Sequence, residues 1–373
     1  MLSRREFIRR SILYALALAG GNTLAGCSQP APTATSVPPT APAPSTSTLE
    51  PTRIVRATVM PSPVITPTPA MTATPIVRAT VTLPPAITPT PAMTATPIAP
   101  VAGEPYLVVA RGATPAAIMR AAIDAFGGMS KFVKPGSDVI LKPNICNAQN
   151  GPEYASTTNP EVIAELVKMC LAAGAKRVRV MDQPFSGTAV TAYVRSGIRE
   201  AVEKAGGEME LMSAAKYTPI DFPATARSLK SQKIYQDILK ADVVFNVPIA
   251  KHHGSAQLTL TMKNLMGVIQ DRNSIHFALD QRIADLSTAI KPTLHIIDGV
   301  RVLMNHGPTG GNLNDVKVAN TIIVSHDPVA ADAYATQFLF NRKPQDIGYI
   351  KMGAEMGLGR LDISNLRVKE VTA

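Results

Sequence analysis

The chain has 373 residues and a formal net charge of +10 at pH 7, but it contains no tryptophan and only 5% aromatic residues. Residues 106–373 carry 30 Lys and Arg against 24 Asp and Glu, so their net charge is a moderate and unclustered +6. Nucleic-acid sites combine concentrated positive charge with aromatic stacking surfaces, and this composition therefore argues against a nucleic-acid partner.

Residues 1–27 predict an export signal. Ser3–Arg9 holds the paired arginines typical of twin-arginine signals, and the apolar run Ser11–Ala19 that follows is too short to span a bilayer comfortably. Leu24–Cys27 resembles a lipobox, which is cleaved before a cysteine that receives lipid. We therefore expect the twin-arginine translocase and the lipoprotein-processing machinery as partners. Lipid on Cys27 would then hold the protein at the outer face of the cytoplasmic membrane or in the periplasm. The alternative is an uncleaved membrane anchor with a chance cysteine.

Residues 28–105 predict a disordered Pro/Thr/Ala-rich tether. This stretch contains 19 of the 32 prolines and only five charged side chains. Within it, residues 54–75 and 76–97 are copies that agree at 18 of 22 positions. Frequent proline removes backbone donors and favours extended backbone, which gives a spacer without a core of its own. We expect it to hold the following domain away from the lipid surface.

Residues 106–373 predict one α/β domain, in which short apolar runs alternate with helical periods. This alternation is typical of a mostly parallel open sheet with helices on both faces. Strands are expected at Leu107–Ala110, Val139–Leu141, Val178–Met181, Glu210–Met212, Val243–Val247, Leu294–Ile297 and Ile322–Ser325. Helices are expected at Pro115–Phe126 after a Thr114 cap, from Asn159-Pro160 to Gly174, at Ala192–Lys204, and from Asp327-Pro328 to Phe340.

Polar side chains follow five of these strands. In open parallel sheets ligands bind outside the carboxyl ends of the strands, so we expect at least three of these groups to converge on one site. The alternative is that they are ordinary helix caps and turns, above all Asp327. The groups are Lys142-Pro143-Asn144, Asp182, the segment Asn246 to His253, Asp298-Gly299 and His326-Asp327.

Two polar clusters lie farther along the chain. Lys251-His252-His253-Gly254 could hold a metal through one imidazole, although no His-x-x-x-His or Glu-x-x-His spacing accompanies it. Lys263-Asn264 is flanked by apolar residues, so it could hold a phosphate or carboxylate. The alternative for Lys263 is a helix end with a lysine that reaches solvent. His276, near Arg272, is either a further site residue or a structural histidine.

The glycine-rich and cysteine-bearing segments are less specific. His306–Gly311, with Gly307, could wrap an anion with backbone N–H groups, or it could be a surface turn. Beyond Cys27 only Cys146 and Cys170 remain, too few for a four-cysteine cage, so no such iron–sulfur cluster is expected. Cys146, close to the expected site, could be a ligand or a reactive thiol.

Residues 106–373 resemble the family known as domain of unknown function 362. Some of its members carry a cysteine-rich ferredoxin segment, which implies redox chemistry for them, but this chain lacks those cysteines. Ile249 also stands where the family usually has the first lysine of a Lys-x-Lys-x-His stretch, which leaves Lys251 and His253. The matching segments include Leu141-Lys142-Pro143-Asn144, Thr158–Glu161, Asn246-Val247-Pro248, Met262–Gly267, Ile283–Leu286, Asp298-Gly299, Gly307-Pro308, Asp327-Pro328 and Gly357–Gly359.

The sequence thus predicts an exported, membrane-anchored α/β protein with one polar pocket at the strand ends. It is expected to be an enzyme or cofactor protein acting on a small anionic ligand, with metal-dependent or redox chemistry as one version. A surface lipoprotein that captures a small anion or metal without catalysis is the alternative. The expected catalytic residues are His253, Asp182 and Lys263, the ligand-binding residues Lys142, Asn144, Lys251, Asn264, Asp298 and Gly307, and the metal ligands His252 and His253.

Overall fold

The computed structural model describes residues 105–373. The predicted twin-arginine signal, the lipobox at Cys27 and the duplicated tether lie outside these residues. No helix in the described part of the chain is long and apolar enough to cross a membrane.

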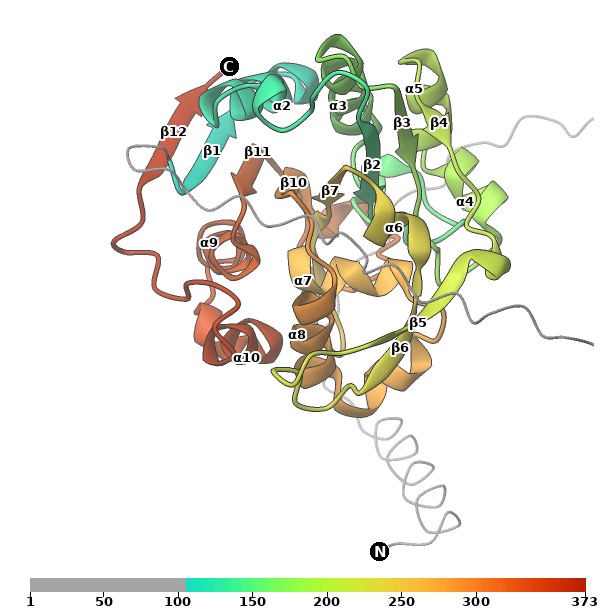
Figure 1. The fold of residues 1–373 in the computed structure, drawn as a ribbon. Coiled ribbons are helices and arrows are strands. Elements are labelled where there is room, and N and C mark those ends of the chain that lie inside the picture. Colours follow the sequence, from blue (N-terminus) through green and yellow to red (C-terminus); the bar gives the residue numbers. More distant parts are fainter. Residues whose placement is uncertain (1–104) are drawn as a thin grey trace, which may run out of the picture. The chain divides into compact units, whose positions relative to one another are not determined.

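A ten-stranded sheet forms the centre of residues 105–373, and its main path runs β12-β1-β11-β10-β7-β2-β3-β4 (Figure 1). Strand β8 joins this path on β10 and carries β9. Most neighbouring pairs are parallel, and the antiparallel ones are β1–β11, β10–β11 and β8–β9. The prediction of a mostly parallel sheet is confirmed. The strands are β1 (Leu107–Arg111), β2 (Asp138–Pro143), β3 (Arg177–Val180), β4 (Glu208–Met209), β7 (Val243–Val247), β8 (Ile249–His253), β9 (Gln257–Thr259), β10 (Leu294–Leu303), β11 (Val316–Ser325) and β12 (Val368–Thr372).

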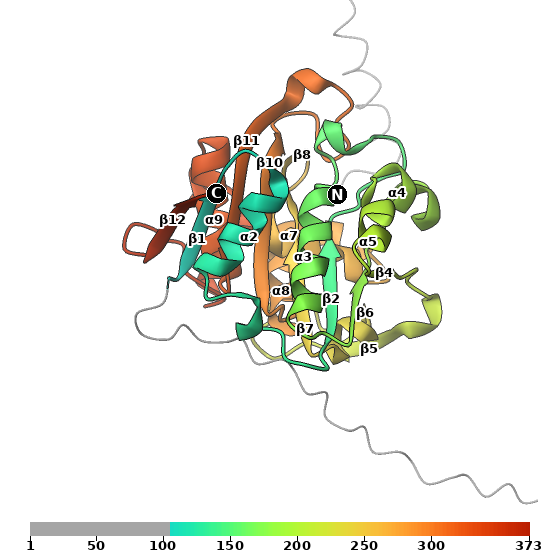
Figure 2. The ribbon, with the colours of Figure 1, turned by 90° about the horizontal axis from the view of Figure 1, so that it is seen from above.

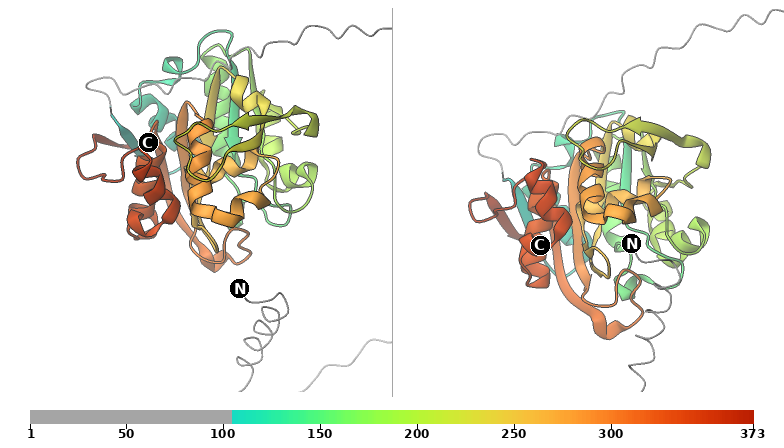
Figure 3. Two further views of the ribbon diagram at one scale, coloured as in Figure 1. Left: turned by 60° about the horizontal axis from the view of Figure 1, so that its bottom comes forward. Right: turned by 90° about the horizontal axis from the view of Figure 1, so that it is seen from below.

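Helices cover both faces of this sheet, as predicted (Figures 1 and 2). One face carries α2 (Pro115–Ala125), α3 (Pro160–Ala172) and α5 (Ile198–Lys204). The other carries α8 (Leu279–Ala289), α9 (Pro328–Phe340) and α10 (Gly348–Glu355), which Figure 3 shows from below. Successive side chains of a strand point to opposite faces, so Val108 enters the core under α2 and α3 while Val109 enters the core on the α8–α10 side.

Three helices begin with a side-chain cap followed by proline. Thr114, Asn159 and Asp327 accept backbone N–H bonds at the starts of α2, α3 and α9. Proline fits the first helical turn because its missing N–H would have no partner there. The capping role given to Asp327 as an alternative is therefore what the structure shows.

The segment from Ala189 to Met212 differs from the prediction. The expected helix Ala192–Lys204 is two helices, α4 (Ala189–Arg195) and α5, because Gly197 has a φ of +72° and breaks the ladder. The prediction of a strand at Glu210–Met212 is also wrong, because the short strand in this region, β4, ends at Met209. The Glu210 carboxylate instead binds Arg179 at 2.7 Å and Lys216 at 2.8 Å.

A long β-hairpin, β10–β11, changes the expected site. Strand β10 continues to Leu303 and β11 returns antiparallel to it, with His295 opposite Ser325. Ser325 at the end of β11 is level with Asn246 on β7 and Lys142 on β2, but β11 runs in the opposite direction to these strands. The chain after Ser325 therefore runs toward the amino ends of β7 and β2, and His326 and Asp327 do not line a site at the carboxyl ends of β2 and β3.

Smaller elements complete the chain. A separate two-stranded sheet, β5–β6, lies between β4 and β7 in the sequence, and a short helix, α7, follows β9. The carboxylate of Asp332 on α9 accepts the backbone N–H groups of Thr261 and Met262 at the start of α7. These elements are β5 (Tyr217–Asp221), β6 (Ser231–Tyr235), α6 (Gln236–Lys240) and α7 (Thr261–Asn264).

Candidate functional site

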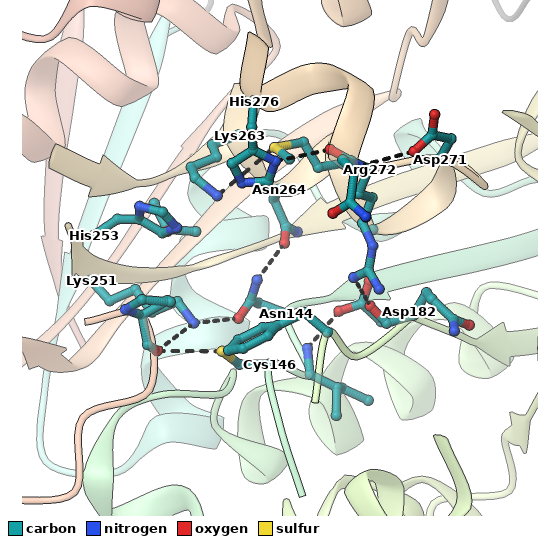
Figure 4. A pocket seen from close by; sticks show the side chains of 18 of the residues that line it. Asn144, Cys146, Asp182, Lys251, His253, Lys263, Asn264, Asp271, Arg272 and His276 are labelled. Atoms are coloured by element: carbon teal, nitrogen blue, oxygen red, sulfur yellow. Dashed lines mark hydrogen bonds between the residues drawn. The ribbon is translucent and has the colours of Figure 1, made fainter. Parts of the chain in front are cut away.

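A cavity of about 580 Å³ opens at the carboxyl ends of β2 and β3, between these ends, strands β8 and β9, and the segment after α7 (Figure 4). Both charged and apolar side chains line it. The lining residues are Asn144, Ile145, Cys146, Asp182, Gln183, Phe185, Lys251, His253, Thr259, Lys263, Asn264, Met266, Gly267, Gln270, Asp271, Arg272, Asn273, His276 and Pro308.

A buried ion pair lies at the base of the cavity. Lys142 Nζ donates to Asp182 Oδ1 at 2.7 Å, and Asp182 Oδ2 accepts from Ile145 N at 2.6 Å. Burial lowers the pKa of Lys142, and the charge of Asp182 opposes that shift. Such a pair is tolerated inside a protein when its other donors and acceptors are satisfied, and here Lys142 also donates to Pro143 O at 2.9 Å. Both oxygens of Asp182 thus already accept hydrogen bonds, and this carboxylate positions Lys142 and Ile145.

Two asparagines connect this pair to a second lysine. Asn264 Oδ1 accepts from Lys142 Nζ at 3.1 Å and from Asn144 Nδ2 at 2.9 Å. Asn144 Oδ1 in turn accepts from Lys251 Nζ at 2.9 Å. Lys251 Nζ also donates to Ser156 O at 2.7 Å and Pro308 O at 3.1 Å. All three acceptors of Lys251 are neutral oxygens, so its positive charge has no carboxylate partner among the described residues.

Lys263 is the third lysine, and its environment differs from that of the other two. Its only polar contact among the described residues is Met266 Sδ at 3.9 Å, and Figure 4 shows its side chain pointing toward His253. Burial lowers the pKa of Lys263 to about 7, with a further lowering from the positive charge of Lys251. An amine with this pKa exchanges a proton readily near neutral pH.

His253 is held as a neutral hydrogen-bond donor. Its Nδ1 accepts the backbone N–H groups of Ser255 and Ala256, each at 3.2 Å, so the neutral ring carries its proton on Nε2. Burial, followed by the charges of Lys263 and Lys251, lowers the pKa of His253 to about 3. The ring can therefore donate a hydrogen bond to a bound ligand, but in this tautomer it cannot accept a proton on Nε2.

His252 does not line the cavity, and its Nδ1 accepts from Gly307 N at 3.1 Å. Neither imidazole therefore offers a free lone pair on Nε2 in the tautomer that its hydrogen bond favours. Among residues 105–373 no group of three or more His, Cys, Asp or Glu is placed to hold a metal ion. Metal binding by His252 and His253 stays a prediction that these contacts do not favour.

Three predicted ligand-binding residues also lie outside the cavity lining, namely Lys142, Asp298 and Gly307. Asp298 lies inside β10, fully buried, and accepts from Asn159 N at 2.7 Å and Val300 N at 3.0 Å. Burial raises the pKa of Asp298 to about 6. Gly307 gives its N–H to His252, while the neighbouring Pro308 lines the cavity. The structure brings together Lys142, Asn144, Asp182, Lys251, His253, Lys263 and Asn264, and leaves out Asp298, Gly307, His252, His326 and Asp327.

The profile of the family described as "Domain of unknown function (DUF362)" matches residues 139–337, which is more than half of the chain. The chain belongs to this family. The matched range includes every cavity-lining residue from Asn144 to Pro308. The cavity is thus built entirely from the part of the chain that matches the DUF362 family.

Two named proteins are similar to this DUF362 member. Thylakoid-associated protein sll1697 of Synechocystis sp. is 27% identical over 237 residues, covering 60% of this chain and 69% of that protein. The lactate racemase apoprotein of Thermoanaerobacterium thermosaccharolyticum matches with a TM-score of 0.36 and 14% identity. The match covers 59% of this chain and 54% of the racemase chain, so the chain spans about half the length of that protein.

The cavity of this DUF362 member also contains residues that sequence reasoning missed. Arg272 donates to Gln183 O at 2.7 Å and to Pro184 O at 2.8 Å, which fixes its guanidinium at the cavity wall. The Thr259 hydroxyl is buried and has no hydrogen-bond partner among the described residues. Thr259 pairs with Lys251 across β8 and β9. The alternation of polar and apolar residues in β9 was a signal for Thr259, whereas nothing local marked Arg272.

Proposed function

We propose that this DUF362 member is an enzyme that acts on a small organic anion, a carboxylate in the simplest case. In this proposal Lys263 is the catalytic group that exchanges a proton with the substrate. The observation that carries the proposal is the position of Lys263 Nζ, which faces the cavity without a carboxylate partner among the described residues. Amines of this kind serve as general acids and bases because their pKa is close to the working pH.

The charge of the cavity supports an anionic substrate. Lys251 and Arg272 donate only to neutral oxygens, so both positive charges remain for a ligand. Of the two acidic side chains in the lining, Asp182 is already paired with Lys142. A carboxylate would form charge-assisted hydrogen bonds with the remaining N–H groups of Arg272, and such bonds are stronger than those between neutral groups. The N–H groups of Lys251 are already used, so this lysine would attract the carboxylate through its charge alone.

The properties of Lys263 and His253 support catalysis rather than simple capture of an anion. A site that only captures an anion needs cations that stay charged, whereas Lys263 is lowered to a pKa of about 7. His253 adds a neutral N–H donor beside it. Such a donor stabilises negative charge that develops on a substrate oxygen while a neighbouring base removes a proton.

The test is exchange of substrate protons with solvent. Small carboxylates that raise the melting temperature of the purified full-length protein would be incubated with it in D2O and followed by NMR. We expect deuterium at the carbon next to the carboxyl or carbonyl group, and we expect Lys263→Met to lose exchange while it still binds. Ligands that bind without exchange in the wild-type protein would instead support the surface binding lipoprotein.

We also propose that the enzyme is exported and attached to the membrane by lipid on Cys27. The order of the twin-arginine and lipobox patterns supports this, as does the name of the similar thylakoid-associated protein. Metal-dependent or redox chemistry is a further version of the proposal. Elemental analysis and a visible absorption spectrum of the protein, purified from the membranes of its native host, test this version. A metal-free, colourless protein would contradict the metal-dependent or redox version.

A further inference from the structure

We infer that Lys263 is also a nucleophile, whose amine forms a Schiff base with the carbonyl group of a small 2-oxo carboxylate bound in the cavity. This inference rests on the proposed function of the same site and names its substrate class. It depends on three features of the site, which are an amine without a partner, cations for a carboxylate, and neutral donors for a carbonyl oxygen.

The first feature appears when the three lysines of the site are compared. Lys142 donates to three oxygens, one of them the Asp182 carboxylate, and Lys251 also donates to three. Each of these two amines thus has an oxygen acceptor for all three of its ammonium N–H groups. Lys263 has only the weak contact with Met266 Sδ at 3.9 Å. Of the three, Lys263 alone can lose a proton without leaving an oxygen acceptor unsatisfied, and its lone pair is then free to attack.

The surroundings of Lys263 favour the neutral amine. Burial and a neighbouring cation are the two ways in which proteins activate lysine as a nucleophile. The positive charges of Lys251, Arg272 and Lys142 lower the pKa of Lys263, and Cys146 opposes them. The other titratable groups of the cavity lining are the carboxylates of Asp182, which is paired with Lys142, and Asp271, and the imidazoles of His253 and His276. These groups come from β2 and the segment after it, from the end of β3, from β8 and from the segment after α7.

The cavity offers places for both functional groups of a 2-oxo carboxylate. Lys251 and Arg272 supply positive charge for the carboxylate. His253 Nε2–H and the buried, unpartnered hydroxyl of Thr259 are neutral donors for the carbonyl oxygen. A buried hydroxyl without a partner is unfavourable, and a bound carbonyl oxygen would accept a hydrogen bond from it. The volume of about 580 Å³ fits a small organic molecule.

The reaction balances without an oxidant or reductant. The Lys263 lone pair forms a bond to the carbonyl carbon while the C=O π pair moves to oxygen, and the proton released by nitrogen moves to that oxygen. The resulting carbinolamine then loses water and forms a C=N bond to Lys263. His253 and Thr259 would stabilise the negative charge on oxygen during the addition. The imine nitrogen in turn withdraws electrons from the neighbouring carbon and makes its protons more acidic.

The test is reductive trapping. The full-length protein would be incubated with pyruvate, oxaloacetate or 2-oxoglutarate in the presence of sodium cyanoborohydride, which reduces an imine to a stable amine. We expect one adduct per chain, located by peptide mass spectrometry on Lys263. Adduct should be lost in Lys263→Met, a change that keeps an unbranched apolar side chain of similar length.

Lys291 provides the matched control. Burial also lowers its pKa, but it does not line the cavity and it donates to Ser287 O at 2.7 Å. Lys291→Met should therefore keep full trapping, and thermal unfolding would verify that both variants fold. Equal labelling of several lysines, or no adduct with any of the three acids, would overturn the inference. If carboxylates still bind and exchange protons while no adduct forms, the proposed function stands and the Schiff base does not.

Discussion

Gly267 lets the chain after α7 pass directly over the buried Lys142–Asp182 pair. A Cβ at this position would overlap Asp182 Oδ1 and would lie 2.6 Å from Lys142 Nζ. We therefore expect Gly267→Ala to separate the pair and to destabilise the protein by about 3–5 kcal/mol, since breaking a buried ion pair leaves its charges uncompensated. Denaturant unfolding followed by circular dichroism measures this loss.

Gly254 gives the control for that substitution. A Cβ added there would meet nothing nearer than Gly307 O at 3.9 Å, an ordinary contact distance. Gly254→Ala should stay within about 0.5–1 kcal/mol of the wild type, the range of a simple change in backbone freedom. Equal stability of the two alanine variants would show that the close approach of Gly267 is not needed to keep the Lys142–Asp182 pair together.

The reactivity of Lys263 should depend on the charge of Lys251. A positive neighbour disfavours the protonated amine, so the removal of that neighbour raises the pKa of Lys263 above about 7. In Lys251→Met the rate at which Lys263 is acetylated should therefore reach half its maximum at a higher pH. Mass spectrometry of the Lys263 peptide over a pH series measures this, and Lys291→Met should leave the curve unchanged. A shift to lower pH would contradict the arrangement described above.

At the scale of elements, the start of α7 depends on the buried carboxylate of Asp332. Burial raises the pKa of Asp332 from 3.8 to about 7. The folded protein thus binds this proton more tightly than the unfolded chain, and stability from this group falls as the pH rises from about 4 to 7. Asp332→Asn cannot titrate, so the wild type should lose stability relative to the variant by at most about 1.4 kcal/mol per pH unit over that range. If the unfolding free energies of the wild type and Asp332→Asn change with pH in parallel, the prediction is wrong.

The predictions that succeeded for these elements rest on local signals. The helix starts at Thr114, Asn159 and Asp327 need only a capping side chain and a proline, and the buried parallel strands read as short apolar runs. The β10–β11 hairpin was not predicted because its outer half extends beyond the buried apolar run into exposed and half-buried residues, for example at Val316–Ala319. Because β11 is antiparallel to β10, the chain after Ser325 leads His326 and Asp327 away from the expected site.

The site itself could be predicted only in part. Lys142 lies at the end of β2, and Asn144 and Asp182 follow β2 and β3, so a rule about strand ends was sufficient to find them. Arg272 belongs to the cavity because its guanidinium binds two carbonyls that lie 88 and 89 residues away in the sequence. The chemistry of His253 is likewise set by two backbone N–H groups in the turn after β8. Hydrogen bonds of these kinds produce no periodic pattern of residues that could be recognised in the sequence.

At the scale of the whole molecule, the proposed export and lipid anchoring by residues 1–27 lead to a testable prediction. We expect Cys27→Ser to abolish labelling by radioactive palmitate and to release the protein from membranes, because two acyl chains are needed for stable anchoring. Replacement of both Arg4 and Arg5 by lysine should leave the protein inside the cell. Fractionation and immunoblotting measure both outcomes. Unchanged membrane attachment of the serine variant would favour the uncleaved anchor.

The way in which β1 is bonded has a mechanical consequence. Residues before 105 lead covalently into β1, and β1 is paired along its whole length with β11 on one side and β12 on the other. Any tension that reaches the domain from a membrane attachment must therefore pass through this strand first. A pull along β1 would have to shear both ladders at once instead of opening their hydrogen bonds one by one. With the proposed membrane attachment, force would therefore enter the domain at a strand bonded on both sides, several strands away in the sheet from Lys142 and Asp182.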